Sequence, residues 1–183
     1  MRVALAQVNL TIGDFAGNLR KIREALVRAR AERAELVILP ELGISGYPPG
    51  DLLERPSFLR DHTRALEELV PESRDIAILT GAILPAPDGG PKRISNSAVL
   101  LDRGEIAHVQ AKTLLPTYDI FDESRYFQPA SDRRVAPPQP AATASMPSAS
   151  RPCISMTWAT ACTAQGSRRL ASSDLRPASS ARS

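Results

Sequence analysis

The pattern of apolar and polar positions predicts strands and amphipathic helices over the first 130 residues. Residues 2–9 alternate as a strand, and residues 35–39 are expected to form a second strand because 36–39 is a short apolar run typical of a buried strand. Between them, residues 19–34 place apolar side chains three and four positions apart, which predicts a helix with Asn18 as its N-cap. A second helix is expected to begin at Pro56 and to end at Pro71.

Three further strands are expected after the second helix. Residues 75–84 form an apolar run, and residues 94–102 with 105–110 predict a hairpin about an Arg103–Gly104 turn. The order β-α-β-α-β-β-β predicts an α/β fold, because an apolar sheet needs helices to cover it.

The last 50 residues have a different composition. Residues 134–183 contain 11 Ala, 10 Ser, 6 Pro and 6 Arg, and they show neither a strand nor a helix period. We therefore expect residues 1–133 to form the domain and residues 134–183 to be a disordered, low-complexity tail. A sharper hypothesis is that GC-rich coding sequence is read out of frame there, and the abruptness of the change favours it over a natural tail.

Charge and hydropathy exclude several classes of function. The net charge of +3 arises in the tail, which holds six Arg and one acid, so the domain itself is slightly acidic. We expect no nucleic-acid partner, because no basic stripe interleaved with aromatic residues is present. No apolar run approaches the roughly 20 residues of a membrane helix, so we expect no membrane association and a cytoplasmic protein.

Cysteine and histidine give no metal or disulfide signature. Cys153 and Cys162 both lie in the tail, and their spacing is not that of a metal site. His62 and His108 are isolated in the sequence, and we expect each at the surface or at the edge of the core.

Two charged residues directly follow predicted strands. Glu41 comes after the strand that Pro40 ends, and it opens a loop rich in glycine and proline. Lys112 follows the second strand of the hairpin and is one of only three lysines among 20 arginines. A carboxylate in such a place can take up a proton, and a compact ammonium suits a small oxyanion.

Three longer stretches stand out in the sequence: GDFAGN (13–18), LVILPELGISGYPPGDLL (36–53) and KTLLPTYDIFDESRYF (112–127). They resemble the nitrilase, or carbon–nitrogen hydrolase, superfamily, and more narrowly the glutaminase domain of glutamine-dependent NAD synthetases. The resemblance covers residues 2–129 and implies part of an α-β-β-α sandwich with a Glu–Lys–Cys triad. It implies that Glu41 is the general base, that Lys112 stabilises the oxyanion and that Tyr118 helps to bind L-glutamine, with no metal.

The third member of the triad falls outside the resemblance. The family's Cys-Glu-Asp-x-Trp motif would lie in the tail, where Cys153 begins CISMTW without the Glu-Asp pair and after Pro152. We therefore expect this chain to lack the nucleophile, with Cys153 as the first candidate and Cys162 as the second.

The resemblance also implies a synthetase domain that is missing from this sequence. No SGGxDS-like or GxxxxGK[ST] loop occurs, so no cofactor is expected in this chain. ATP with Mg is expected only for the synthetase domain, which would use the released ammonia to amidate deamido-NAD. The intact parent is expected to be a homo-oligomer. Two alternatives stay open: another carbon–nitrogen hydrolase acting on a small amide or nitrile, and a non-catalytic fragment.

Overall fold

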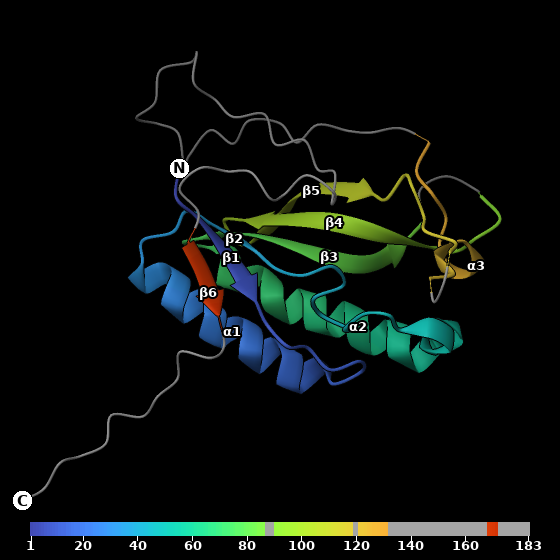
Figure 1. The fold of residues 1–183 in the computed structure, drawn as a ribbon, viewed down its shortest axis with the longest axis horizontal. Coiled ribbons are helices and arrows are strands. Elements are labelled where there is room, and N and C mark those ends of the chain that lie inside the picture. The colour runs from blue at the N-terminus through green and yellow to red at the C-terminus, as the bar shows by residue number, and fades with distance from the viewer. Residues whose placement is uncertain (87–89, 119–120, 132–167, 172–183) are drawn as a thin grey trace, which may run out of the picture.

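A mixed sheet forms the centre of the protein in the computed structural model, which describes residues 1–86, 90–118 and 121–131 and the backbone of 168–171. The strands lie in the order β5-β4-β3-β2-β1-β6 (Figure 1). Strands β1, β2, β3 and β6 are parallel, β4 is antiparallel to β3, and β5 is antiparallel to β4. Their bounds are Val3–Gln7 (β1), Leu36–Ile38 (β2), Ala77–Pro85 (β3), Ile94–Asp102 (β4), Glu105–Ala111 (β5) and Arg168–Ala171 (β6).

Two helices cover one face of this sheet. Helices α1 (Phe15–Ala31) and α2 (Pro56–Leu69) lie side by side against it in Figure 1. Two short 3₁₀ helices flank α2, η1 (Gly50–Glu54) before it and η2 (Val70–Ser73) after it, and the short helix α3 (Glu123–Tyr126) lies at the far end of the sheet.

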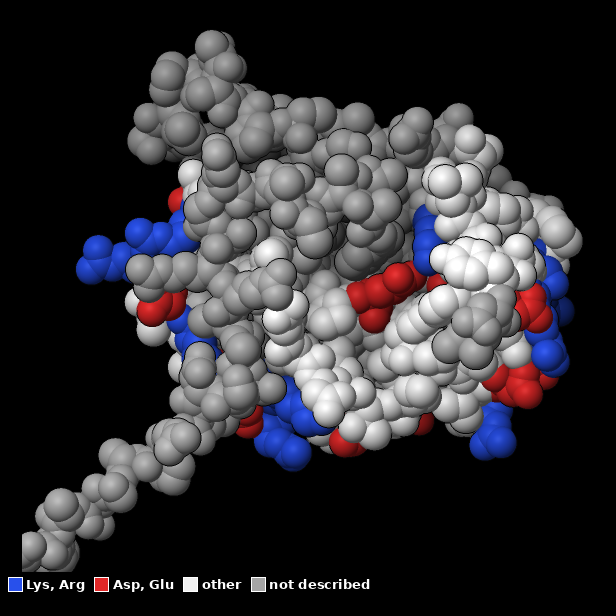
Figure 2. All heavy atoms as spheres, viewed as in Figure 1, with Lys and Arg blue, Asp and Glu red and all other residues white. Residues whose placement is uncertain are grey.

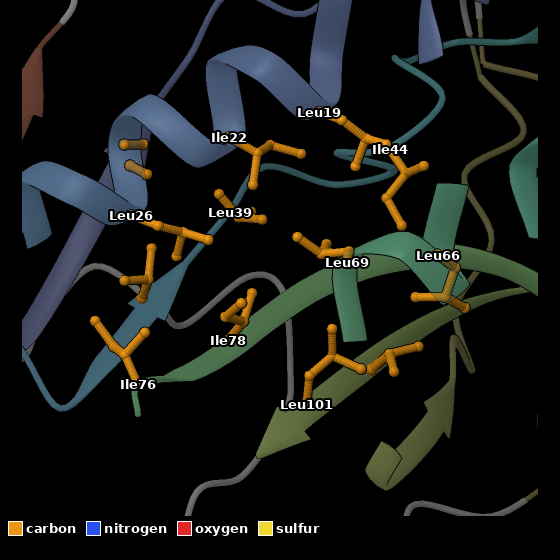
Figure 3. Packing of buried hydrophobic residues seen from close by; sticks show 14 of the residues in the cluster. Leu19, Ile22, Leu26, Leu39, Ile44, Leu66, Leu69, Ile76, Ile78 and Leu101 are labelled. Carbon is orange, nitrogen blue, oxygen red and sulfur yellow. The ribbon is translucent and has the colours of Figure 1, made fainter. Parts of the chain in front are cut away.

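The main core lies between the two helices and the sheet (Figure 3). Its fully buried side chains include Ile22, Leu26, Leu69, Ile78 and Leu101. Side chains on alternate strand positions face the other way, and a second buried cluster lies there. Its members are Leu36, Leu79, Ala98 and Leu100.

The predicted order of elements and the α/β class are confirmed. The hairpin turns at Arg103–Gly104 as expected, with both residues at positive φ, and Pro56 is the first residue of α2. Strand β6 was not expected, because it falls within the predicted tail. The other residues of that tail, 134–167 and 172–183, lie outside the residues that the structure describes. None of the described helices is long and apolar enough to cross a membrane.

The predicted N-cap of the first helix was wrong. Helix α1 begins four residues earlier than expected, and the side chain of Asp14 caps it by accepting the N–H of Gly17 at 2.9 Å. Asn18 is instead buried inside the first turn. Its side chain pairs with the backbone N–H and C=O of Thr11 and donates to the C=O of Ile44. It therefore ties the loop before α1 to the loop that follows Glu41.

Candidate active site

The two charged residues singled out from the sequence meet at one end of the sheet. Strand β5 runs in the same direction as β2, because two antiparallel pairings separate it from β3, which is parallel to β2. Glu41 after β2 and Lys112 after β5 therefore leave the sheet at the same edge. Lys112 Nζ lies 2.8 Å from Glu41 Oε1. Figure 2 shows acidic side chains near the middle of the face in view, with basic side chains beside them.

The backbone after Glu41 is pressed against β3. A Cβ added at Gly81 would lie 2.3 Å from the backbone nitrogen of Leu42 and 3.2 Å from the carbonyl carbon of Glu41. Leu42 itself has a φ of 46°, in the left-handed region that non-glycine residues seldom adopt. Glycine in β3 therefore permits the close approach that sets where the Glu41 carboxylate stands.

A second carboxylate, which the sequence reasoning did not single out, completes the site. Glu123 on α3 is buried, and its two oxygens lie 3.1 Å (Oε1) and 2.9 Å (Oε2) from Lys112 Nζ. Oε1 also accepts the Tyr47 hydroxyl at 2.9 Å. Glu123 lies in the charged run DESR, which looks like a solvated turn. Only the packing against Tyr47, 76 residues away, reveals its burial.

Asn96 joins the two acids. Its side-chain amide donates to Glu41 Oε1 at 2.6 Å and lies 3.5 Å from Glu123 Oε1. Asn96 stands near the start of β4, which runs opposite to β2 and so begins at the edge where Glu41 and Lys112 lie.

The two carboxylates differ in what their oxygens can do. Glu41 uses Oε1 for both Lys112 and Asn96, whereas its Oε2 makes no hydrogen bond to any part of the chain that the structure describes. Its side chain is 27% exposed, whereas that of Glu123 is 5% exposed. A base needs a free lone pair within reach of the substrate. Glu41 meets this condition. Glu123 does not, because its Oε1 accepts from Tyr47 and Lys112, while its Oε2, which has no hydrogen-bond partner among the described residues, is buried against the Lys112 ammonium at 2.9 Å.

The electrostatics favour a permanently charged Lys112. Burial alone would lower the pKa of Lys112, but the hydrogen bonds to Glu41 and Glu123 outweigh it and raise the pKa above the ordinary lysine value. Burial, and then the hydrogen bond to Glu123, raises the pKa of the Tyr47 phenol. Lys112 therefore suits charge stabilisation, and Tyr47 stays a neutral donor at physiological pH.

Tyr118 lies at the outer end of a line of aromatic rings. Its side chain is 70% exposed, and its ring stands edge-on to Phe121 with centroids 5.6 Å apart. Phe121 in turn lies 6.1 Å from Tyr47, whose hydroxyl reaches Glu123. The rings thus run from the surface to the buried charges, although no hydrogen bond joins Tyr118 to Glu41 or Lys112 among the described residues.

The family comparison agrees with this geometry. The carbon–nitrogen hydrolase family model matches residues 2–161. The chain belongs to the carbon–nitrogen hydrolase family. The resemblance identified in the sequence is therefore confirmed.

Individual relatives narrow the comparison. The chain is 48% identical over 135 residues to a glutamine-dependent NAD(+) synthetase from Synechocystis, a match that covers 70% of this chain and 24% of the relative. A solved glutamine-dependent NAD+ synthetase from Acinetobacter baumannii is 38% identical, with a TM-score of 0.66, over 73% of this chain and 24% of that one. The chain thus spans about a quarter of the length of the synthetases that it matches.

An amidase from Nesterenkonia sp. AN1 is also similar. It is 29% identical with a TM-score of 0.64, and the match covers 74% of this chain and 50% of the amidase. That structure is of a mutant amidase, in which the acetamide moiety of fluoroacetamide is attached covalently to the active-site cysteine.

The remaining candidate residues lie away from the site or outside the described chain. Cys153 and Cys162 belong to the residues that the structure does not describe. His62, expected at the surface or the core edge, is fully buried, which corrects that prediction. It lies on α2 at the apolar position four residues after Phe58.

No metal site is present among the described residues, where no three His, Cys, Asp or Glu side chains cluster suitably. A groove of about 460 Å³ lies beside the site, along the loop after Lys112. Neither Glu41 nor Glu123 lines it, so the groove is separate from the charged cluster. Its lining residues are Pro91, Lys92, Thr113, Leu114, Leu115, Ser124, Phe127, Gln128 and Pro129.

Proposed function

We propose that this site hydrolyses the side-chain amide of L-glutamine, as the glutaminase part of a glutamine-dependent NAD synthetase. The observation that carries the proposal is the pairing of Glu41 and Lys112 at 2.8 Å with Glu41 Oε2 left free. An amide is a poor electrophile, so its hydrolysis is helped by a thiolate that splits the reaction into two steps. The names of the matched synthetases point to glutamine as the amide.

Each described residue has a definite role in this reaction. Glu41 Oε2 takes the proton of the attacking thiol and gives it to the departing amide nitrogen, which leaves as ammonia. It later takes a proton from the water that cleaves the thioester and gives it to the departing cysteine sulfur, which restores the thiol and the carboxylate. Lys112 donates to the oxygen that becomes negative in each tetrahedral intermediate. Glu123 holds Lys112 and Tyr47 in place, and Tyr118 contacts the glutamine near the entrance.

The thiol is assigned to a cysteine outside the described residues. Cys153 is the first candidate, although its surroundings in the sequence lack the Glu-Asp pair expected from the resemblance. The use of the ammonia by an ATP- and Mg-dependent half, the homo-oligomeric parent and the cytoplasmic location stay predictions.

A second candidate is hydrolysis of a small aliphatic amide. The similarity to the Nesterenkonia amidase favours it, because that protein matches over a share of this chain comparable to the synthetases. The aromatic line from Tyr118 to Tyr47 favours glutamine instead, since a longer substrate is needed to reach from the exposed ring to the buried acids.

The test compares binding with turnover on the same chain. L-glutamine and acetamide are titrated into the protein by calorimetry, and ammonia release is measured with both amides. Saturable binding of glutamine is expected, weakened in Tyr118→Ala and retained in Tyr118→Phe. Glu41→Gln, which keeps the shape of the side chain, is expected to bind glutamine and to release no ammonia.

Two results would contradict the proposal. One is preference for acetamide over glutamine in both binding and release, which would favour the second candidate. The other is ammonia release that survives Glu41→Gln. Where the native chain releases ammonia, Cys153→Ala and Cys162→Ala identify the nucleophile. Glutamine binding without release from the native chain would mean that the chain lacks a working thiol, as the sequence predicts.

A further inference from the structure

Asn96 contacts every charged residue of the site. Its side chain donates to Glu41 Oε1 at 2.6 Å and reaches Glu123 Oε1 at 3.5 Å. Its backbone carbonyl accepts the N–H of Lys112 at 2.8 Å. The residue is fully buried, and its Oδ1 has no hydrogen-bond partner among the described residues. The two acids therefore determine the orientation of the amide.

The backbone that carries Asn96 is held from the helix side as well. Asn96 pairs with Ile83 of β3 in the antiparallel register. The N–H of Ile83 donates to Nε2 of His62 at 2.9 Å, so a buried side chain of α2 occupies the place where a further strand would pair. β2 ends at Ile38, opposite Leu79, and so stops short of this level of the sheet. The backbone at Asn96 is therefore held by β3 on one side and by the N–H of Lys112 on the other.

We propose that Asn96 is the positioning residue that makes Glu41, rather than Glu123, the base. With Lys112 and Asn96 both donating to one oxygen of Glu41, the plane of the carboxylate is fixed and the other oxygen is free. Lys112 alone would hold one oxygen without fixing that plane, because an ammonium binds as a point charge without a preferred plane. This inference rests on the proposed function, since only a base needs the free oxygen.

The amide also separates two like charges. Glu41 and Glu123 both approach the same Asn96 nitrogen, and Lys112 supplies the single ammonium between them. Two carboxylates that share one cation repel each other in a partly buried site. A neutral donor between them compensates part of this repulsion without adding a charge. An aspartate in the same place would have the same shape and the opposite effect.

The first measurement follows the Glu41 side chain directly. Scalar couplings of ¹³C-labelled glutamate report the Glu41 rotamer in the native chain, in Asn96→Leu and in Asn96→Asp. The matched control is Ser97→Ala at the next position of the strand. It also removes a buried polar group, but the Ser97 hydroxyl bonds to Ser95 and not to the two acids. We expect one rotamer in the native chain and in Ser97→Ala, and averaging over several rotamers in both Asn96 variants.

The melting temperature separates positioning from folding. Asn96→Leu fills the site with a side chain of similar shape and no charge, so it carries the test if Asn96→Asp fails to fold. A purely structural role predicts that Asn96→Leu lowers the melting temperature while Glu41 keeps its native rotamer. That result would overturn the proposal, as would a native rotamer at an unchanged melting temperature.

The second measurement is ammonia release from glutamine. We expect kcat to fall roughly tenfold or more in Asn96→Leu with little change in KM, because a misplaced base affects the reaction step more than binding. Loss of the Glu41 rotamer with an unchanged kcat would overturn the proposal. A native chain that releases no ammonia would count against the proposed function, whereas the rotamer measurement would still decide the role of Asn96.

Discussion

His62 lies with its imidazole fully buried between α2 and β3, where Nε2 accepts the N–H of Ile83 at 2.9 Å. An accepting Nε2 places the proton on Nδ1, which has no hydrogen-bond partner among the described residues. Adding a second proton would break the bond to Ile83 and leave a charge in the core. Burial accordingly lowers the pKa of His62 from 6.5 to about 4. The fold should therefore lose stability as the pH falls below neutral.

The size and sign of this loss follow from proton linkage. Between pH 6.5 and 4 the unfolded chain carries one more proton at this residue than the folded chain does. The free energy of unfolding then falls by up to about 1.4 kcal/mol for each pH unit. From pH 7.5 to pH 5 the loss due to His62 amounts to about 2 kcal/mol. Above about pH 7.5 this residue should contribute almost no pH dependence.

Urea unfolding of the native chain and of His62→Gln, followed by circular dichroism from pH 5 to pH 8, isolates this effect. Glutamine does not titrate, and its side-chain oxygen can still accept the N–H of Ile83. Titration of the carboxylates is common to both proteins, so it cancels in their difference. We expect His62→Gln to gain about 2 kcal/mol on the native chain between pH 7.5 and pH 5. Parallel stability curves over this range would refute the argument.

Further substitutions test the packing of the site and of the core. Gly81→Ala would push its Cβ into the backbone of Leu42, so we expect a loss of about 1–3 kcal/mol in urea unfolding and a displaced base in a crystal structure. Lys112→Met leaves two partly or fully buried carboxylates without a cation, so we expect a loss of about 3–5 kcal/mol at pH 7, measured by urea unfolding. Leu26→Ala in the core should lower the free energy of unfolding by about 2–5 kcal/mol. Its control, Val27→Ala on the exposed side of the same helix, should change that free energy by less than about 0.5 kcal/mol. Equal effects of the two substitutions would contradict the packing of the helix described above.

The elements that could be predicted from the sequence are those set by local signals. Pro56 starts α2, a two-residue turn closes the β4–β5 hairpin, and an apolar run ended by Pro40 places Glu41 at a strand end. Lys112 was found for the same reason, because it follows the last residue of β5. Strand ends on one edge of a sheet are brought together by topology, so two residues of the site followed from the pattern alone.

The residues that were missed depend on distant partners. The predicted cap, Asn18, was wrong because Thr11 and Ile44 occupy its side chain, so that Asp14 caps the helix instead. His62 did carry a local signal, since it shares the apolar face of α2.

Asn96 also carried a signal that could have been read. It is polar on the face of β4 that Ala98 and Leu100 share, and a lone amide in such a row indicates a buried partner. Glu123 gave no comparable sign, because its burial depends on Tyr47 and Lys112 together.

The length of the third diagnostic stretch, KTLLPTYDIFDESRYF, has a structural explanation in how Glu123 returns to Lys112. The N–H of Lys112 binds Asn96, while its C=O accepts the N–H of Ala130, so the chain leaves the sheet and comes back at the same residue. On the return, the N–H of Gln128 binds the C=O of Ile94 at the start of β4. The loop is therefore anchored at both ends, and an insertion or deletion between Lys112 and Glu123 would move the buried carboxylate relative to the ammonium that it holds. A long, closed loop of this kind constrains its sequence along its whole length, whereas a lone strand-end lysine constrains only its neighbours.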